Sequence, residues 1–149
     1  MSADLHCHTK LSDGSLSVEE ILGLAKRAGI ETVAITDHDT LAGALKGKVI
    51  GERMGIKVIP GVELSSYDMV RKRKVHILAY LCREPARLEG ICKKIAQERK
   101  KAALIMMQKV MRIYPITTDM VARRAQGSTN VYKQHMMHAL MDAGYTDEL

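Results

Sequence analysis

The sequence predicts an α/β fold in its first part and an all-helical segment in its second. Up to about residue 83, short runs rich in β-branched residues alternate with stretches of helical periodicity, whereas only helical periodicity follows. Strands that alternate with helices are typical of a largely parallel sheet. We therefore expect two domains, an α/β part at residues 1–83 and a helical part at residues 84–149.

The first part begins with a short apolar run at residues 3–5, and turn-forming residues follow at 11–15. Ser17 and Glu20 form an S-x-x-E capping box, which starts a helix that Gly29 closes. Further strands are expected at residues 32–36, 56–59, 62–65 and 75–80, with a second helix at residues 40–54.

The second part predicts one long amphipathic helix followed by two shorter ones. Apolar residues recur at helical spacing between residues 88 and 113. The shorter helices are expected at residues 118–124 and 131–143, with Gly144 as a stop. The ten methionines are interpreted as core-filling side chains.

The composition fits a globular chain. Apolar residues make up 46% of the sequence, which is enough to bury a core. No apolar run approaches the ~20 residues that span a bilayer, and the N-terminus lacks the pattern of a secretory signal. The three cysteines show no C-x-x-C spacing, which argues against a disulfide framework or a zinc knuckle. We expect a cytoplasmic protein with no membrane partner.

The net charge of +6 is unevenly distributed. Residues 83–112 contain nine Lys/Arg and three acidic residues, and a basic run occupies residues 71–74. Such stretches could attract nucleic acid, although a solvated helix face is the more frequent explanation. With 3% aromatic residues and no Trp or Phe, a stacking platform for single-stranded bases is poorly supported.

Potential metal ligands occur at or just beyond the predicted strand ends. The carboxyl ends of parallel strands face a common surface, so these side chains can converge. His6 and His8 alternate along an extended segment, and both imidazoles should therefore point to one side. Mixed histidine and carboxylate ligands favour zinc, manganese or iron over calcium or magnesium. The six candidates are His6, His8, Asp13, His38, Glu63 and His76.

Some of these residues have a second interpretation. His76 could simply mark the exposed face of a strand. Asp37 and Asp39 could orient imidazoles or cap a helix. His135 and His138, spaced i, i+3, could form a metal pair or lie on a helix surface.

Two or three divalent ions held close together can activate water, neutralise phosphate oxygens and stabilise a leaving oxygen. The ligand set therefore predicts hydrolysis of phosphate esters. A serine, cysteine or histidine nucleophile is unnecessary for this chemistry.

Four motifs, in the correct order over residues 3–82, resemble the PHP (polymerase and histidinol phosphatase) superfamily. They are HCHT (6–9) with SDG (12–14), ITDHDT (35–40), PGVE (60–63) and VHIL (75–78). The resemblance implies a distorted βα-barrel. It also implies that His6, His8 and Glu63 bind one ion and that Asp13 and His38 bind a second. Glu63 would bridge to a third ion together with His76.

The helical segment resembles the insertion of stand-alone PHP phosphoesterases, which cleave nucleoside bisphosphates or trim short oligonucleotides from the 5′ end. In many of them a basic residue, Pro and His on the inserted region help to hold the substrate phosphate. Here the stretch is Lys133-Gln134-His135, without the proline, and it implies that Lys133 and His135 contact phosphate.

The family's later motifs, a histidine after a strand and a final Asp-x-His, have no counterpart in the sequence. We therefore expect the N-terminal portion of a longer enzyme, with an incomplete barrel. Its open sheet edge favours pairing in a homodimer. The alternatives are a phosphatase for a non-nucleotide ester such as histidinol phosphate, and a non-catalytic fragment that binds metal or nucleic acid.

Overall fold

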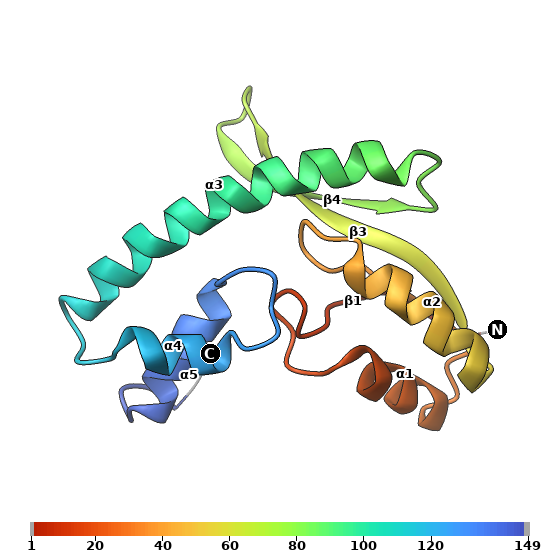
Figure 1. The fold of residues 1–149 in the computed structure, drawn as a ribbon, viewed down its shortest axis with the longest axis horizontal. Helices are drawn as coiled ribbons and strands as arrows, with labels where there is room; N and C mark the ends of the chain where they lie inside the picture. Colours follow the sequence, from red (N-terminus) through yellow and green to blue (C-terminus); the bar gives the residue numbers. More distant parts are fainter. Residues whose placement is uncertain (1, 148–149) are drawn as a thin grey trace.

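The computed structural model describes residues 2–147 and combines a four-stranded sheet with helices (Figure 1). The predicted α/β class is confirmed, as is the change to helices after the last strand. The elements in chain order are β1 (Ala3–Cys7), α1 (Val18–Arg27), β2 (Thr32–Ile35), α2 (Ala42–Met54), β3 (Lys57–Asp68), β4 (Arg73–Tyr80), α3 (Pro85–Met111), α4 (Thr118–Arg124) and α5 (Lys133–Asp142).

The sheet has the strand order β1-β2-β3-β4 and changes direction at its last strand. β1 pairs with β2 and β2 pairs with β3 in parallel, as expected, whereas β3 and β4 are antiparallel. The prediction of two separate strands at 56–59 and 62–65 was wrong, because β3 is one strand of 12 residues. Its residues 57–60 pair with β2 and its residues 61–68 pair with β4.

The change of partner within β3 occurs at Pro60 and Gly61. Pro60 has no N–H to donate to a ladder, so the regular pairing with β2 ends there, and only an isolated bridge at Glu63 follows on that side. At Gly61 a Cβ atom would lie 2.9 Å from Thr36 Cγ2 and 3.1 Å from Tyr80 Cδ1. The missing side chain lets β2 and β4 approach β3 from two sides. The strand curves visibly, and the sheet forms an incomplete, curled barrel wall (Figure 1).

The first core lies between this sheet and helices α1 and α2. Its buried members are Val18, Leu22, Ala25, Val33, Ile35 and Ile56. α2 packs closely against the strands because glycine recurs every fourth residue on its inner face. A Cβ atom at Gly43 would lie 2.0 Å from Asp37 Oδ2, and one at Gly51 would lie 2.4 Å from Val58 Cγ2. Larger side chains at these positions would push the helix away from the sheet.

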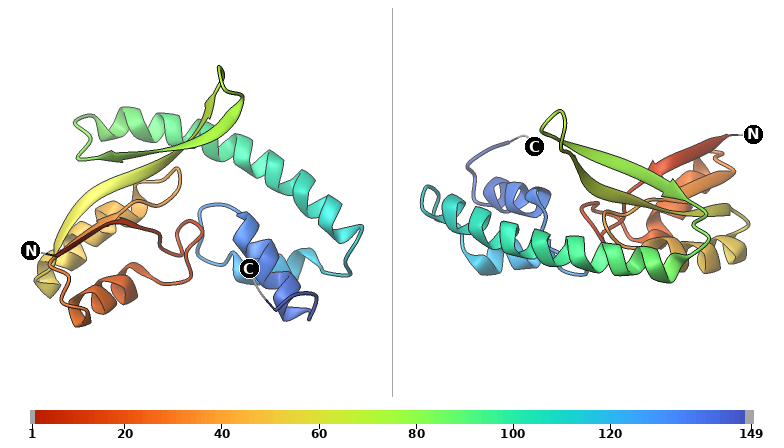
Figure 2. Two further views of the ribbon diagram at one scale, coloured as in Figure 1. Left: turned by 180° about the vertical axis from the view of Figure 1, so that it is seen from behind. Right: turned by 90° about the horizontal axis from the view of Figure 1, so that it is seen from above.

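A second core lies among the three C-terminal helices. Its buried members are Ala103, Ile116, Val121, Met136, Ala139 and Leu140, and further methionines pack around them. α3 spans the distance between the two cores: it begins near β4 and reaches the α4–α5 pair, as all views show (Figures 1 and 2). Leu88 and Cys92, near its start, pack with Leu41 and Val62 and thereby attach α3 to the sheet side.

The C-terminal helices return to the N-terminal loops. Both the amide and the hydroxyl of Thr129 donate to the Leu11 carbonyl at 2.9 Å. The proposed domain boundary near residue 83 coincides with the turn between β4 and α3, but the division into two domains stays a prediction. Among residues 2–147, no helix is long and apolar enough to cross a membrane. The cytoplasmic location and the homodimer also stay predictions.

Candidate metal centre

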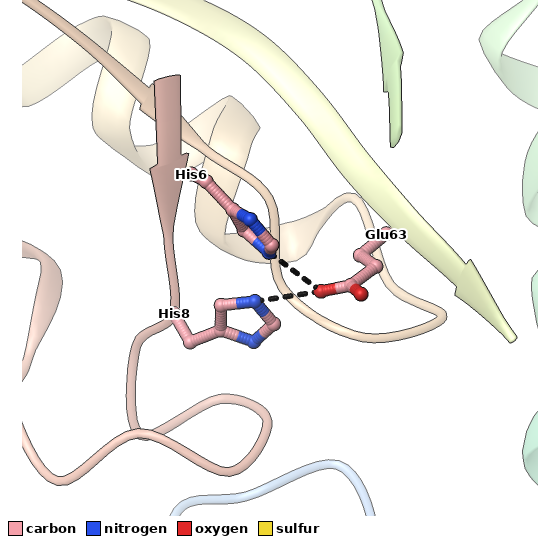
Figure 3. A group of neighbouring side chains, drawn as sticks. All are labelled: His6, His8 and Glu63. Carbon is pink, nitrogen blue, oxygen red and sulfur yellow. Dashed lines mark hydrogen bonds and ion pairs between the residues drawn. The ribbon is translucent and has the colours of Figure 1, made fainter. Parts of the chain in front are cut away.

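β1 positions the first two candidate ligands. His6 lies within β1 and His8 directly follows it, so the two imidazoles project to the same side. Both Nε2 atoms lie 2.8 Å from Oε2 of Glu63 on β3. Figure 3 shows the two rings pointing from β1 toward this carboxylate. Three residues separated by up to 57 positions thus meet at one oxygen atom.

Glu63 is the centre of the group. Its side chain is 5% exposed, and its second oxygen, Oε1, lies 2.6 Å from Nδ1 of His76. In the β3–β4 ladder Glu63 pairs with Leu78 and Ser65 pairs with His76, which makes Glu63 and His76 diagonal neighbours on one face. The expectation that both lie at strand ends was wrong, because they lie inside β3 and β4. The antiparallel hairpin brings them together instead.

Asp13 and His38 lie on loops. His8 Nδ1 is 2.9 Å from Asp13 Oδ1, and His38 Nε2 is 3.6 Å from Asp13 Oδ2. His38 follows β2 and forms an isolated parallel bridge with Glu63. That bridge brings His38 Nε2 to 3.8 Å from Glu63 Oε2.

The six predicted side chains form three overlapping groups whose potential ligand atoms lie within 4.8 Å of one another. His8, His38 and Glu63 each belong to two of these groups. Neighbouring imidazole centroids in the series His6, His8, His38 and His76 are 4.7–5.0 Å apart. Four imidazoles around two carboxylates form a donor set that fits transition-metal ions. The three groups are His6–His8–Glu63, His8–Asp13–His38 and His38–Glu63–His76.

At Glu63, Asp13 and His38 the electrostatics favour the protonation states that metal ligands need, whereas Asp13 and nearby carboxylates raise the pKa of His8 in the metal-free chain. Burial by itself raises the pKa of Glu63, but the bond to His6 and the surrounding imidazoles outweigh it and leave the pKa below its usual value. Burial likewise opposes ionisation of Asp13, whose pKa is nevertheless lowered by His8 and His38. Burial lowers the pKa of His38 despite the nearby carboxylates. At neutral pH both carboxylates are therefore charged and His38 is neutral.

Asp37 holds the loop that carries Asp13. Its carboxylate is fully buried and accepts bonds from the Thr9 amide at 2.7 Å, the Thr9 hydroxyl at 2.8 Å and the Ser12 hydroxyl at 2.7 Å. Burial raises its pKa, and these three donors oppose that effect. Asp37 thus stabilises a loop, and its hydrogen bonds in residues 2–147 go to Thr9 and Ser12 instead of to the expected imidazole.

Asp39 holds the loop that carries His38. It has a positive φ of 53°, and its carboxylate accepts bonds from the amide and hydroxyl of Ser65, both at 2.8 Å. Arg99 of α3 adds a third bond at 2.6 Å. The α2 N-cap is Leu41, so Asp39 does not serve as the expected helix cap. Its carboxylate joins three elements of the chain.

Sequence reasoning missed Arg99, although a signal was present. The buried stripe of α3 includes Leu88, Cys92 and Ala103, and Arg99 falls on the same stripe at helical spacing. A charged side chain on an otherwise apolar face needs a partner when it is buried. Its partner is Asp39.

A cavity of about 570 Å³ opens beside the candidate ligands. Asp13, His38 and His76 lie on its wall, and Lys74, Arg99 and Lys133 bring basic groups to it. The other residues on its wall are Ser65, Ser66, Tyr67, Tyr132 and Gln134.

The predicted phosphate contacts lie in different surroundings. Lys133 faces the cavity, in the first turn of α5. His135 is buried, and its Nδ1 accepts a bond from the Tyr132 amide at 3.1 Å. His135 and His138 belong to none of the potential metal-binding groups in the described part of the chain.

Comparison with known proteins adds to this geometry. The family model described as PHP domain matches residues 4–141. The chain is 37% identical over 147 residues to the phosphoribosyl 1,2-cyclic phosphate 1,2-diphosphodiesterase of Eggerthella lenta, covering 97% of this chain and 56% of the relative. It is 30% identical over 145 residues to the 5′-3′ exoribonuclease Rnm of Escherichia coli, covering 95% of this chain and 48% of the relative.

The fold has a close match among solved structures. A metal-dependent phosphoesterase from Bifidobacterium adolescentis superposes with a TM-score of 0.88 at 27% sequence identity, covering 99% of this chain and 52% of that one. The chain therefore spans about half the length of the proteins that it matches. The incomplete barrel observed here corresponds to that share.

Proposed function

The chain belongs to the PHP domain family, and on this premise we propose that it contributes the metal-binding part of a metal-dependent phosphoesterase. The observation that carries the proposal is the set of three overlapping ligand groups, which adjoins a cavity with basic side chains on its wall. The proposed ligands are the six predicted from the sequence: His6, His8, Asp13, His38, Glu63 and His76.

Two or three ions of manganese, zinc or iron would supply activated water and charge neutralisation at the phosphate. Glu63 can serve two ions, because its oxygens face different imidazoles: Oε2 faces His6 and His8, and Oε1 faces His76. Lys133 would hold a phosphate oxygen; its position on the cavity wall and at the positive end of the α5 dipole supports this role. His135 supports this end of α5 through its bond to Tyr132, and its own contact with phosphate stays a prediction.

We propose a small nucleotide or a short oligonucleotide as the substrate. A cavity of about 570 Å³ lies within the usual range for small-molecule sites. The similarity to an exoribonuclease and the basic groups on the wall support a phosphate-containing nucleotide substrate.

A phosphate ester without a nucleobase is the second candidate. The observation that favours it is the 37% identity to an enzyme named for phosphoribosyl 1,2-cyclic phosphate, over nearly the whole of this chain. The proposed metal ligands would be the same for both substrate classes. Histidinol phosphate also belongs to this class of phosphate esters without a nucleobase.

Elemental analysis of the purified chain, together with hydrolysis assays, tests the proposal. The substrates are a nitrophenyl phosphodiester, a nucleoside 3′,5′-bisphosphate, a ribose cyclic phosphate and histidinol phosphate. We expect two or more tightly bound ions per chain and turnover that His8→Ala abolishes. Lys133→Gln should raise KM for the preferred substrate and leave the metal content unchanged, since Lys133 is not a proposed ligand.

The contrary results separate the alternatives. Metal binding without turnover of any substrate would support a non-catalytic module. Salt-dependent binding of oligonucleotides that survives His6→Ala and His8→Ala would point to a nucleic-acid-binding role for the basic residues. Less than one ion per chain would contradict the proposed centre in this 149-residue chain.

A further inference from the structure

The segment between α4 and α5 contacts the loop that carries Asp13. The Ser128 hydroxyl donates to the Ser12 carbonyl at 2.6 Å, and Thr129 donates twice to the Leu11 carbonyl. Gln134, in the first turn of α5, donates through Nε2 to Asp13 Oδ2 at 2.9 Å. Three successive positions of the loop are therefore held by residues more than 110 positions away in the sequence.

Tyr132 makes the equivalent contact with the loop that carries His38. Its side chain is buried, and its hydroxyl donates to the His38 carbonyl at 3.0 Å. Its ring also lies nearly parallel to the His38 imidazole, at 25° and 6.0 Å between centroids. Burial raises the pKa of Tyr132 to about 12, so the hydroxyl keeps its proton as a donor. Both the backbone and the ring of His38 are thus restrained by one side chain.

Arg99 completes the support from α3. Its guanidinium donates to Asp39 Oδ2 and to the Ser65 hydroxyl, which connects the residue after His38 to β3. The same guanidinium carbon lies 4.7 Å from the centre of the Tyr132 ring, a cation–π distance. Arg99 therefore fixes the loop directly through Asp39 and indirectly by orienting Tyr132.

We propose that Arg99, Tyr132 and Gln134 are positioning residues that set the geometry of Asp13 and His38. The proposal rests on the proposed function, because it takes Asp13 and His38 as metal ligands. The other ligands are positioned differently: His6 and His8 by β1 and the residue after it, and Glu63 and His76 by the register between β3 and β4. The helical segment thus adds support for Asp13 and His38 to that of Asp37 and of the bridge between His38 and Glu63.

Gln134 supports Asp13 through its side-chain amide. A proline at this position would have no side-chain N–H to donate. The bond to Asp13 Oδ2 needs such a donor. Asp13 presents its other oxygen to His8 at 2.9 Å, so Gln134 determines which way the carboxylate plane can turn. Errors of about half an ångström in such a plane matter for a metal site.

Metal titration of the three single variants tests the inference. Tyr132→Phe removes one hydroxyl, Gln134→Ala removes one amide, and Arg99→Lys keeps the charge but loses the planar fork. We expect each variant to bind one of its Mn²⁺ ions about 10- to 100-fold more weakly, which is the range for residues that orient metal ligands. The affinity for the remaining Mn²⁺ should not change. Arg99→Ala should be more severe than Arg99→Lys. Matched controls on α3 and just after it are Gln108→Ala and Tyr114→Phe, which lie outside the cavity wall.

A second measurement keeps the inference testable if the chain binds no metal. Two-dimensional ¹H–¹⁵N spectra of the histidine side chains in the metal-free protein should show shifted His38 signals in Tyr132→Phe and Gln134→Ala. The His6 and His76 signals should stay in place. Unchanged His38 signals, or equal shifts for all of these histidines, would overturn the inference. If the unaltered chain bound no metal, the proposed function would be refuted, but this spectroscopic test could still be carried out.

Discussion

The proposed ligands divide into two sets that are held in different ways. His6, Glu63 and His76 belong to strands, and His8 directly follows β1. The register between β3 and β4 fixes the relative positions of Glu63 and His76. Asp13 and His38 belong to loops, and their positions depend on polar contacts with distant parts of the chain. The strand-borne set follows from local pattern, whereas the loop-borne pair requires the complete tertiary structure.

This difference predicts different responses to substitution. A strand-borne side chain can be replaced without moving its neighbours, since the backbone ladder persists. A loop-borne side chain also moves when one of its supporting contacts is removed. Variants should therefore fall into two classes. Some remove a metal-ligand atom, and others keep all the ligand atoms but displace one of them.

Glu63→Gln should have the largest effect, because Glu63 connects the two sets. The amide keeps the size of the side chain but loses the charge that the surrounding imidazoles face. We expect the metal affinity to fall by more than about 100-fold, the upper limit for residues that only orient ligands. Metal titration with elemental analysis measures it. Glu52→Gln, on the exposed face of α2, is the matched control, and equal metal content in both variants would contradict the central role of Glu63.

Asp37→Ala should disturb the loop-borne pair by removing the contacts that hold the Asp13 loop. The change leaves the amide and hydroxyl of Thr9 without their acceptor in a buried position, and the Ser12 hydroxyl loses its shortest bond. We expect the free energy of unfolding to fall by about 3 kcal/mol or more, since each unsatisfied buried donor costs about 1–3 kcal/mol. Urea denaturation of the metal-free chain measures this. A loss no greater than that of Glu52→Ala would show that the loop does not depend on Asp37.

The contact between His8 and Asp13 predicts a pH window for the metal-free chain. Burial by itself lowers the pKa of His8, but the bond to Asp13 and nearby carboxylates outweigh it and raise the pKa above 6.5. The stabilisation of the folded state by protonated His8 is therefore full below pH 6.5 and is lost as the pH rises through the pKa of His8 in the folded state. The pKa of Asp13 is lowered below 3.8, so its stabilisation is present above 3.8 and is lost as the pH falls through the folded value.

The contribution of this pair should therefore be greatest between pH 3.8 and 6.5. Melting temperatures measured with a chelator from acidic to mildly alkaline pH test the window. The difference between the unaltered chain and Asp13→Asn should be largest inside it and smaller on both sides. A difference that is constant with pH would contradict the electrostatic contribution of the pair.

Ser17→Ala should have the smallest effect and leaves both sets intact. The Ser17 hydroxyl accepts a bond from the Glu20 amide at the start of α1. Its loss should cost about 1 kcal/mol, the usual value for an N-cap, and metal binding should not change. Thermal unfolding and metal titration measure the two quantities. A change in metal affinity would show that the centre also responds to general loss of stability.

Much of the strand-borne set could be predicted from the sequence. The capping box at Ser17 and Glu20 was predicted and is present. The spacing of His6 and His8 indicated that both imidazoles face one side, and both do face Glu63. The position of Glu63 was predicted less well, because local pattern suggested a break at Pro60 and Gly61. The strand continues through these residues by exchanging one partner strand for another.

The supports of the loop-borne pair could not be predicted in the same way. Asp39 has the sequence context of a residue that orients an imidazole, but its carboxylate meets Ser65 and Arg99. Nothing local to Arg99 specifies a partner 60 positions away. Such contacts depend on where α3 lies after the two cores have formed, which is a property of the whole fold.

The long return of residues 128–134 to the first loops also has a consequence for the order of folding. Gln134 is 121 positions from Asp13, and Tyr132 is 94 positions from His38. Contacts of such separation form slowly, and during synthesis they must wait until the later residues have left the ribosome. β1 to β4 emerge earlier and can pair first. We therefore expect a nascent chain to assemble His6, Glu63 and His76 before Asp13 and His38 reach their final positions, so that the centre matures in two stages.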